Sequence, residues 1–293
     1  MIRKITLLFV TLALLALPLI GLAETVASSF YPIHLLTLNL VDGIDGVEAR
    51  CVAAPQTGCL HDYQLSAGDM RTLSEADVFC ICGAGMEGYL EHVFEALPEL
   101  KVVDASAEVP LLPSETGETE FNPHIWLSPA NARIMIRNLA EGLAEAMPEH
   151  AEAIERNRAA YDARLQALDE ELTAGLAPFA GAELITFHEA FPYFAEAYDM
   201  HVAAVIVREP GDALSPREIA ELVETVRALG NPPLFTEPQY ADLAAKTVAA
   251  ETGAGVWELD PCVTGPETDI PLTYYEDVMR QNLRVLQDAL SHG

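Results

Sequence analysis

Residues 149–176 read EHAEAIERNRAAYDARLQALDEELTAGL, and this stretch predicts one long helix that begins just after Pro148. Its large apolar residues recur at helical spacing and form one stripe: Ile154, Tyr161, Leu165, Leu168 and Leu172. Roughly 27 residues at about 1.5 Å each give a rod about 40 Å long, enough to cross a whole domain. Because similar sequence patterns flank the stretch on both sides, we interpret this helix as a strut that joins two lobes.

Short apolar strands alternate with helices on each side of the strut, which is typical of a parallel α/β sheet. The predicted strands are 25–30, 47–53, 78–82 and 102–103 before it, and 183–187, 202–207, 234–235 and 256–259 after it. We therefore predict an α/β fold of two lobes, each a mostly parallel sheet flanked by helices. The expected units are an N-terminal lobe at 24–147, a linking helix at 148–177 and a C-terminal lobe at 178–293.

The first 23 residues have the pattern of a signal peptide. Arg3 and Lys4 form a basic start, residues 7–17 an apolar core, and Gly21-Leu22-Ala23 a small-x-small cleavage site. The sequence therefore predicts an exported protein on the periplasmic or extracellular side of the cell membrane.

The chain is strongly acidic, with a formal net charge of −29 at pH 7. A nucleic-acid-binding surface needs lysine and arginine to replace the counterions of the phosphates, so this charge argues against nucleic acid as a partner. It also argues against adhesion to anionic membranes. The charge raises the local concentration of cations, although only weakly at physiological salt.

The segment 122–129, NPHIWLSP, places His124 on a stiff turn. Pro123 fixes its own φ and keeps Asn122 out of the helical region. Ser128 and Pro129 have the pattern of an N-cap and a first helical position, so a helix begins just beyond the histidine. Such a turn suits a ligand that must be oriented before its partner arrives.

Three further side chains are predicted at the ends of strands. His188 and Asp260 directly follow predicted strands, and His61 follows another across a short turn. Ligands of open parallel sheets bind at the carboxyl ends of the strands. If both lobes face one cleft, His61 and His124 lie on one wall, with His188 and Asp260 on the other. Three imidazoles and one carboxylate suit a divalent metal such as zinc.

The chain resembles the cluster A-I metal-binding proteins of ABC transporters, the zinc- and manganese-specific solute-binding proteins. The resemblance covers essentially the whole mature chain, and the matching segments are LHDY at 60–63, NPHIWL at 122–127, FHEAF at 187–191, FTEPQ at 235–239 and LDP at 259–261. It implies two α/β lobes joined by one long helix. It also implies that His61, His124, His188 and Asp260 bind the ion.

The third ligand bears on the choice of metal. Members of this family devoted to manganese tend to have a carboxylate at the position of His188. Three nitrogen ligands favour Zn²⁺, whereas Mn²⁺ prefers oxygen-rich sites. We therefore expect Zn²⁺, with Mn²⁺ as the alternative.

Several neighbouring residues are candidates for supporting roles. Glu189, Arg208 and Glu237 are candidate partners that hold an imidazole or neutralise Asp260, although ordinary salt bridges at the cleft edge are an equal alternative. Cys59 and Cys262 flank predicted ligands and form a candidate disulfide, with Cys51–Cys59 and thiolate ligation as the alternatives. The other histidines are expected at the surface or in packing: His34, His92, His150, His201 and His292.

The resemblance predicts a monomeric, non-enzymatic binding protein that captures a divalent metal ion and delivers it to an ABC transporter permease. A zinc-dependent hydrolase is the first rival, with Glu189 or Glu237 as general base. Against it, Pro192 stands where a metalloprotease-type motif would need a histidine, and four protein ligands would fill the zinc shell. A metal-linked surface adhesin is the other rival.

Overall fold

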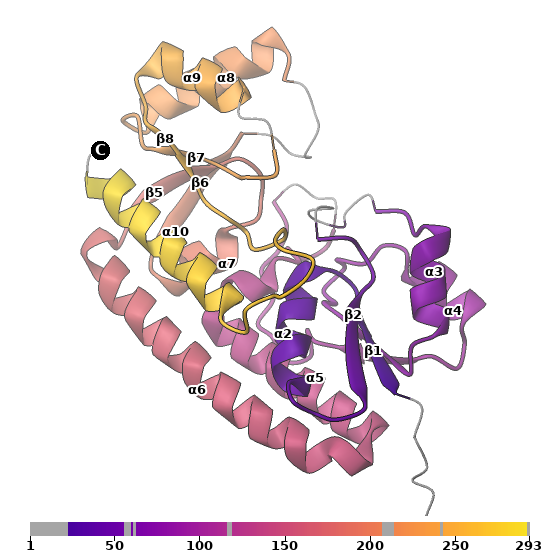
Figure 1. The fold of residues 1–293 in the computed structure, drawn as a ribbon. Helices are drawn as coiled ribbons and strands as arrows, with labels where there is room; N and C mark the ends of the chain where they lie inside the picture. Colours follow the sequence, from indigo (N-terminus) through magenta and orange to yellow (C-terminus); the bar gives the residue numbers. More distant parts are fainter. Residues whose placement is uncertain are drawn as a thin grey trace, which may run out of the picture.

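Within the residues that the structure describes, eight strands form two separate parallel sheets of four strands each (Figure 1). The computed structural model describes residues 23–55, 60, 63–115, 119–206, 214–240 and 243–291. The first sheet has the order β2-β1-β3-β4, and its strands are β1 (Glu24–Ser28), β2 (Val47–Cys51), β3 (Val78–Ile81) and β4 (Lys101–Asp104). The second has the order β6-β5-β7-β8, and its strands are β5 (Glu183–Thr186), β6 (His201–Val205), β7 (Leu234–Thr236) and β8 (Val256–Glu258). The predicted fold class is confirmed.

The helices of the N-terminal half are α2 (Tyr31–Val41), α3 (Ala67–Ser74) and α4 (Leu90–Ala96). Helix α2 has Pro32 in its first turn, where a proline is tolerated. Helix α4 begins only at Leu90. Gly83, Ala84 and Gly85 all have positive φ and form a turn that delays the helix.

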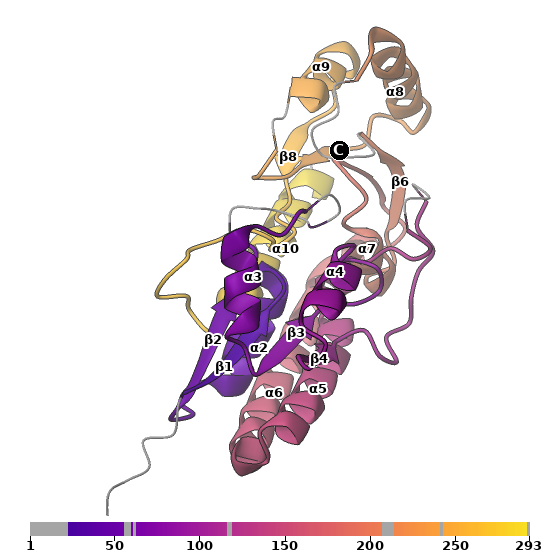
Figure 2. The ribbon, with the colours of Figure 1, turned by 90° about the vertical axis from the view of Figure 1, so that its right-hand side faces the viewer.

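The middle of the chain is a helical hairpin. Helix α5 (Pro129–Ala146) begins at the Ser128 N-cap, whose side chain accepts a hydrogen bond from Asn131 N. The 3-10 turn η2 (Pro148–His150) then leads into α6 (Ala151–Leu176). Helix α6 has 26 residues, and it lies against α5, α2 and α10. It runs along one side of the molecule past both sheets (Figures 1 and 2).

The C-terminal half contains η3 (Ala177–Phe179), α7 (Pro192–Ala197), α8 (Pro216–Ala228), α9 (Leu243–Thr252) and α10 (Tyr274–Ser291). Between β8 and α10 the chain passes back over the N-terminal half. Tyr31 Oη donates to Pro266 O at 3.1 Å, and Asn39 Nδ2 donates to Leu272 O at 3.0 Å. The two halves are therefore joined by this crossing segment as well as by α6.

One hydrophobic core runs through both halves. It extends from Val26 and Phe79 in the first sheet to Leu184 and Phe235 in the second. A smaller cluster, which includes Ile185 and Val226, lies between the second sheet and helices α8 and α9. Interiors are close-packed, so a core shared by both halves limits how far the lobes can move apart. No helix in the described part of the chain is long and apolar enough to span a membrane.

Candidate metal centre

His124 is buried at the junction of the two halves. It lies just before the 3-10 helix η1 (Ile125–Leu127), and its side chain packs at 5.2 Å from the Trp126 ring. Asn122 Oδ1 accepts from the His124 backbone N at 2.9 Å and lies 3.0 Å from His124 Nδ1. Cys82 Sγ, just beyond β3, lies 3.6 Å from Pro123 O, so this turn is seated at the carboxyl end of the first sheet.

His188 occupies the matching place in the second half, two residues beyond the end of β5. Its side chain is buried, and its Nδ1 lies 2.5 Å from Glu237 Oε1, just beyond β7. The other carboxylate oxygen, Glu237 Oε2, accepts from Gln239 Nε2 at 2.7 Å. The ring also lies edge-on to Tyr240, with the centroids 5.8 Å apart. Glu237 therefore sets the orientation of the His188 imidazole.

The two imidazoles face each other through their Nε2 atoms, which are 3.3 Å apart. Asn122 Nδ2 donates to Glu189 O, so the amide oxygen Asn122 Oδ1 faces His124. Because this oxygen can only accept a hydrogen bond, the proton of a neutral His124 ring lies on Nδ1. The Glu237 carboxylate places the proton of a neutral His188 ring on Nδ1 in the same way. Both Nε2 atoms therefore present lone pairs to one point, which is the arrangement of two metal ligands.

Asp260 follows β8 and is held by its own turn. Its Oδ1 accepts from Cys262 N at 2.7 Å, and its backbone N and O bond the Asn282 side chain at 2.9 and 2.8 Å. Burial raises the pKa of this carboxyl to about 6; the hydrogen bond from Cys262 N opposes the rise, and the charge of Glu237 adds to it. Next to it, Pro261 O accepts from Trp126 Nε1 at 2.8 Å, which ties the Asp260 turn to the His124 segment.

The structure brings together two of the four predicted ligands. Within the described ranges, one group of three metal-binding side chains has its ligand atoms within 4.8 Å of one another. That group is Glu24, Glu149 and His150, which are not the predicted ligands. His124, His188 and Asp260 therefore do not form such a compact group. His61 lies outside the described residues, as do Arg208, Cys59 and residues 1–22 of the predicted signal peptide.

Glu189 and Asn122 connect the site to the segment before it. Glu189 accepts from Ser114 Oγ at 3.0 Å and from Glu115 N at 2.6 Å. Asn122 accepts on its backbone oxygen from Tyr193 Oη at 2.8 Å. Sequence reasoning missed the role of Asn122, although its place two residues before His124 is typical of a local side-chain to backbone bond.

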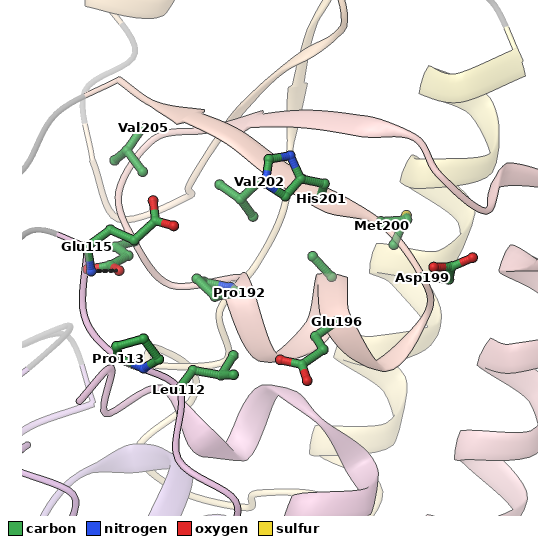
Figure 3. A pocket seen from close by; sticks show the side chains of 12 residues that line it. Leu112, Pro113, Glu115, Pro192, Glu196, Asp199, Met200, His201, Val202 and Val205 are labelled. Carbon is green, nitrogen blue, oxygen red and sulfur yellow. Dashed lines mark hydrogen bonds between the residues drawn. The ribbon is translucent and has the colours of Figure 1, made fainter.

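A groove lies between residues 112–115 and the surface of α7 and β6 (Figure 3). It is lined by carboxylates such as Glu115 and Glu196 and by apolar side chains such as Met200 and Val205. Neither His124 nor His188 lines it. The groove therefore does not include the two imidazoles that face each other.

Both candidate disulfides, Cys59–Cys262 and Cys51–Cys59, include Cys59, which lies outside the described residues. Cys51 and Cys262 are free thiols in the structure. Cys262 is fully buried at a positive φ of 62°, and burial raises its pKa well above the usual range. Cys51 Sγ lies 3.0 Å from Ala53 O. These two thiols thus pack in the protein interior or bond locally.

Comparison with known proteins identifies the family. The model of the family described as zinc-uptake complex component A, periplasmic, matches residues 26–289. The chain belongs to this family. The zinc-uptake component A family consists of solute-binding proteins for metal transport and not of enzymes, so the resemblance expected from the motifs is confirmed and the hydrolase alternative is wrong.

Individual curated proteins and solved structures match over most of the chain. The high-affinity zinc uptake system protein ZnuA of Brucella suis biovar 1 is 28% identical over 317 residues, covering 93% of each chain. The zinc-binding lipoprotein AdcA of Streptococcus pneumoniae serotype 4 is 28% identical over 279 residues, covering 90% of this chain but 55% of AdcA. The solute-binding protein FpvC of Pseudomonas aeruginosa, solved in complex with Mn²⁺, has a TM-score of 0.81 and 26% identity, covering 92% of this chain and 98% of FpvC. The chain thus spans little more than half the length of its AdcA relatives.

Proposed function

We propose that this protein is the exported binding component of an ABC importer, which captures Zn²⁺ between its two lobes and delivers it to the membrane permease. Family membership supports the transport role, and relatives named for zinc binding and zinc uptake support the metal. The ion is the cargo of the protein.

The observation that carries this proposal is the pair of Nε2 atoms 3.3 Å apart, each on a ring whose Nδ1 is held by a buried acceptor. Two ligands of one zinc ion, each about 2.0–2.1 Å from the metal, are separated by a distance of this size in a tetrahedral site. The imidazoles are thus oriented before the ion arrives. Little ordering is then required of His124 and His188 on binding.

We infer that His61 and Asp260 complete the ligand set. The Asp260 turn is linked to the His124 segment through Trp126, which holds this turn at the junction of the two halves. A bound cation also offsets the repulsion between the Asp260 and Glu237 carboxylates. Loss of these outer ligands is the proposed route by which the ion leaves for the permease.

Zinc is preferred over manganese because of the nitrogen ligands. Imidazole suits zinc, whereas manganese prefers carboxylate, carbonyl and water oxygens. The Mn²⁺ complex of FpvC keeps manganese as the alternative cargo. We propose that the protein acts as a monomer on the periplasmic or extracellular side of the cell membrane, in keeping with the periplasmic family description.

The test is elemental analysis of the mature protein purified without chelators, followed by competitive titration with Zn²⁺ and Mn²⁺. We expect zinc to co-purify and to outcompete manganese. His124→Ala and His188→Ala should each abolish tight zinc binding. His201→Ala is the matched control, because His201 is exposed and bonds Glu183, away from the pair. Unchanged zinc affinity in both cleft variants, or a preference for manganese, would overturn the proposal.

A further inference from the structure

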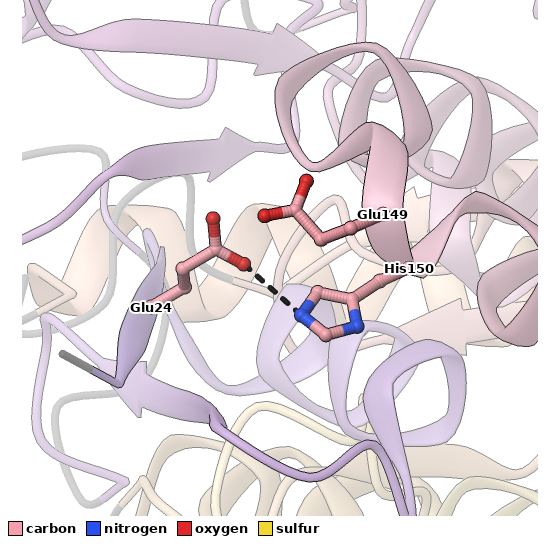
Figure 4. A group of neighbouring side chains, drawn as sticks. All are labelled: Glu24, Glu149 and His150. Atoms are coloured by element: carbon pink, nitrogen blue, oxygen red, sulfur yellow. Dashed lines mark ion pairs between the residues drawn. The ribbon is translucent and has the colours of Figure 1, made fainter. Parts of the chain in front are cut away.

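A second group of metal-binding side chains lies at the other end of the N-terminal half. Glu24 is the first residue of β1, and Glu149 and His150 belong to the turn η2 between α5 and α6. One ligand atom from each lies within 4.8 Å of the other two, and His150 Nε2 is 3.3 Å from Glu24 Oε2. Figure 4 shows the three side chains converging from two elements that are far apart in the sequence.

The backbone holds these three residues in place. Pro148 starts the 3-10 turn, and His150 N donates to Met147 O at 3.0 Å. Glu24 N donates to Gly46 O at 2.7 Å, which fixes the start of β1 against the residues before β2. The ligands therefore come from a strand and a tight helical turn, which position side chains more precisely than long loops do.

The charges around Glu24 favour a bound cation between the three side chains. Glu24 Oε2 is buried and its partner is His150 Nε2, although the Glu24 side chain as a whole is 27% exposed. Burial raises the pKa of Glu24, the charges of Glu149 and Asp77 add to the rise, and His150 and Lys101 oppose it. The Lys101 ammonium donates to Ala146 O at 3.3 Å, and the Asp77 carboxylate accepts from Thr25 N at 2.8 Å. A divalent ion between the three side chains would offset the repulsion between the Glu24 and Glu149 carboxylates.

We propose that Glu24, Glu149 and His150 form a second binding site for a divalent transition metal, with Zn²⁺ as the best match. One imidazole and two carboxylates are ligands of zinc sites, in which water completes the coordination. With a single nitrogen ligand, and with Glu149 exposed, the site should bind zinc more weakly than the imidazole pair. Its chemical effect is to tie the α5–α6 turn to the first strand.

This site is separate from the cleft. Glu24 begins β1, whereas the imidazole pair lies beyond the carboxyl ends of the strands. At about 3.3 Å per residue, the five residues of β1 alone separate Glu24 from the carboxyl end of the sheet, where the imidazole pair lies, by roughly 13 Å. No residue is shared between them. The proposal therefore does not depend on the function proposed for the cleft.

The experiment is a Zn²⁺ titration of the metal-stripped mature protein against a chelator of intermediate affinity. We expect the protein to bind two equivalents of Zn²⁺. The tight equivalent should be lost in the double variant His124→Ala plus His188→Ala, and the weaker equivalent should persist in it. Adding His150→Ala or Glu149→Gln should remove the weaker equivalent. His92→Ala, an exposed histidine on α4, is the matched control and should leave both equivalents unchanged.

A second readout locates the ion and guards against misfolding. In the His124→Ala plus His188→Ala background, zinc should raise the melting temperature, and this rise should vanish when His150→Ala is added. Melting in the presence of chelator checks that His150→Ala is folded. Anomalous scattering at the zinc edge should place an ion between Glu24, Glu149 and His150. The proposal is overturned if the double variant binds no zinc, or if His150→Ala and Glu149→Gln both retain the weaker equivalent.

Discussion

At the scale of single residues, the site depends on the acceptors behind the imidazoles. Glu237 fixes the ring of His188, and Asn122 fixes the ring of His124. Both are nearly or fully buried, so water does not replace them easily. Partners that orient a metal-binding histidine also keep its Nε2 lone pair directed at the ion.

Glu237→Gln should weaken zinc binding about 10- to 100-fold, because the amide is a poorer acceptor for Nδ1 and carries no charge. Competitive titration measures this change. The matched control is Glu258→Gln, at the exposed end of β8. Equal losses in both variants would mean that net charge near the cleft, and not the bond to His188, decides affinity.

Glu87 gives the metal-free protein a pH-dependent stability. It is 4% exposed, and its carboxylate accepts from Cys82 N and Gly83 N at 2.7 and 3.1 Å. Burial raises its pKa from 4.5 to about 7. Between these values the native state holds a proton that the unfolded state has lost, so this group makes the protein less stable as pH rises through that window.

Glu87→Gln should therefore remove a pH-dependent loss of up to about 3 kcal/mol between pH 4.5 and 8. Urea unfolding of wild type and variant at several pH values measures the difference. The comparison of variants is needed because burial lowers the pKa of His34 to about 4, which favours the native state as pH rises through the same range. Glu91→Gln, exposed on α4, is the control; a pH-independent difference for Glu87→Gln would contradict the argument.

At the scale of elements, α5 lies unusually close to the first sheet. A Cβ placed on Gly142, in the middle of this helix, would lie 2.4 Å from Val103 Cγ1 and 2.6 Å from its Cγ2. Glycine is unfavourable within a helix by about 0.5–1 kcal/mol relative to alanine. Its presence here is explained by the contact between α5 and β4.

Gly142→Ala should destabilise the protein by about 1–3 kcal/mol despite the better helix propensity of alanine, because the added methyl overpacks the interface. Val103→Ala in addition should recover part of this loss by making room. Unfolding free energies of the two single variants and the double variant measure the coupling. If Gly142→Ala is stabilising on its own, α5 and β4 are less tightly packed than the structure shows.

At the scale of the whole molecule, the proposed metal centre lies where the two halves meet. Trp126 Nε1 donates to Pro261 O, and Tyr275 Oη donates to Trp126 O at 2.7 Å, so the His124 segment is bonded to the C-terminal half. Together with the shared core, these bonds favour small shifts of one lobe over wide opening. Zinc bound between the lobes should stabilise the entire fold.

At a free zinc concentration 100 times the Kd, this stabilisation should be about 2.7 kcal/mol. It should shrink as pH falls below about 6, because protonated imidazoles no longer bind the metal. Thermal unfolding with and without zinc at pH 7.5 and pH 5 measures both effects, with His124→Ala plus His188→Ala as the control. An equal zinc-induced shift at the two pH values would show that imidazoles do not hold the ion.

The sequence by itself determined the repeating strands and helices, the long helix and the stiff turn that carries His124. These features follow from local rules, namely apolar periodicity, proline geometry and N-caps, which act over a few residues. The starts of α2 and α4 depend on where Pro32 and the turn at 83–85 allow a helix to begin.

Only the tertiary structure decided which groups meet. His124 and His188 are 64 residues apart, and Glu237 is another 49 beyond. The burial of Cys262 as a free thiol and the group formed by Glu24, Glu149 and His150 likewise follow from packing between distant elements. Convergence of this kind has no local signal, because it depends on how the core of the whole chain closes and not on any one segment.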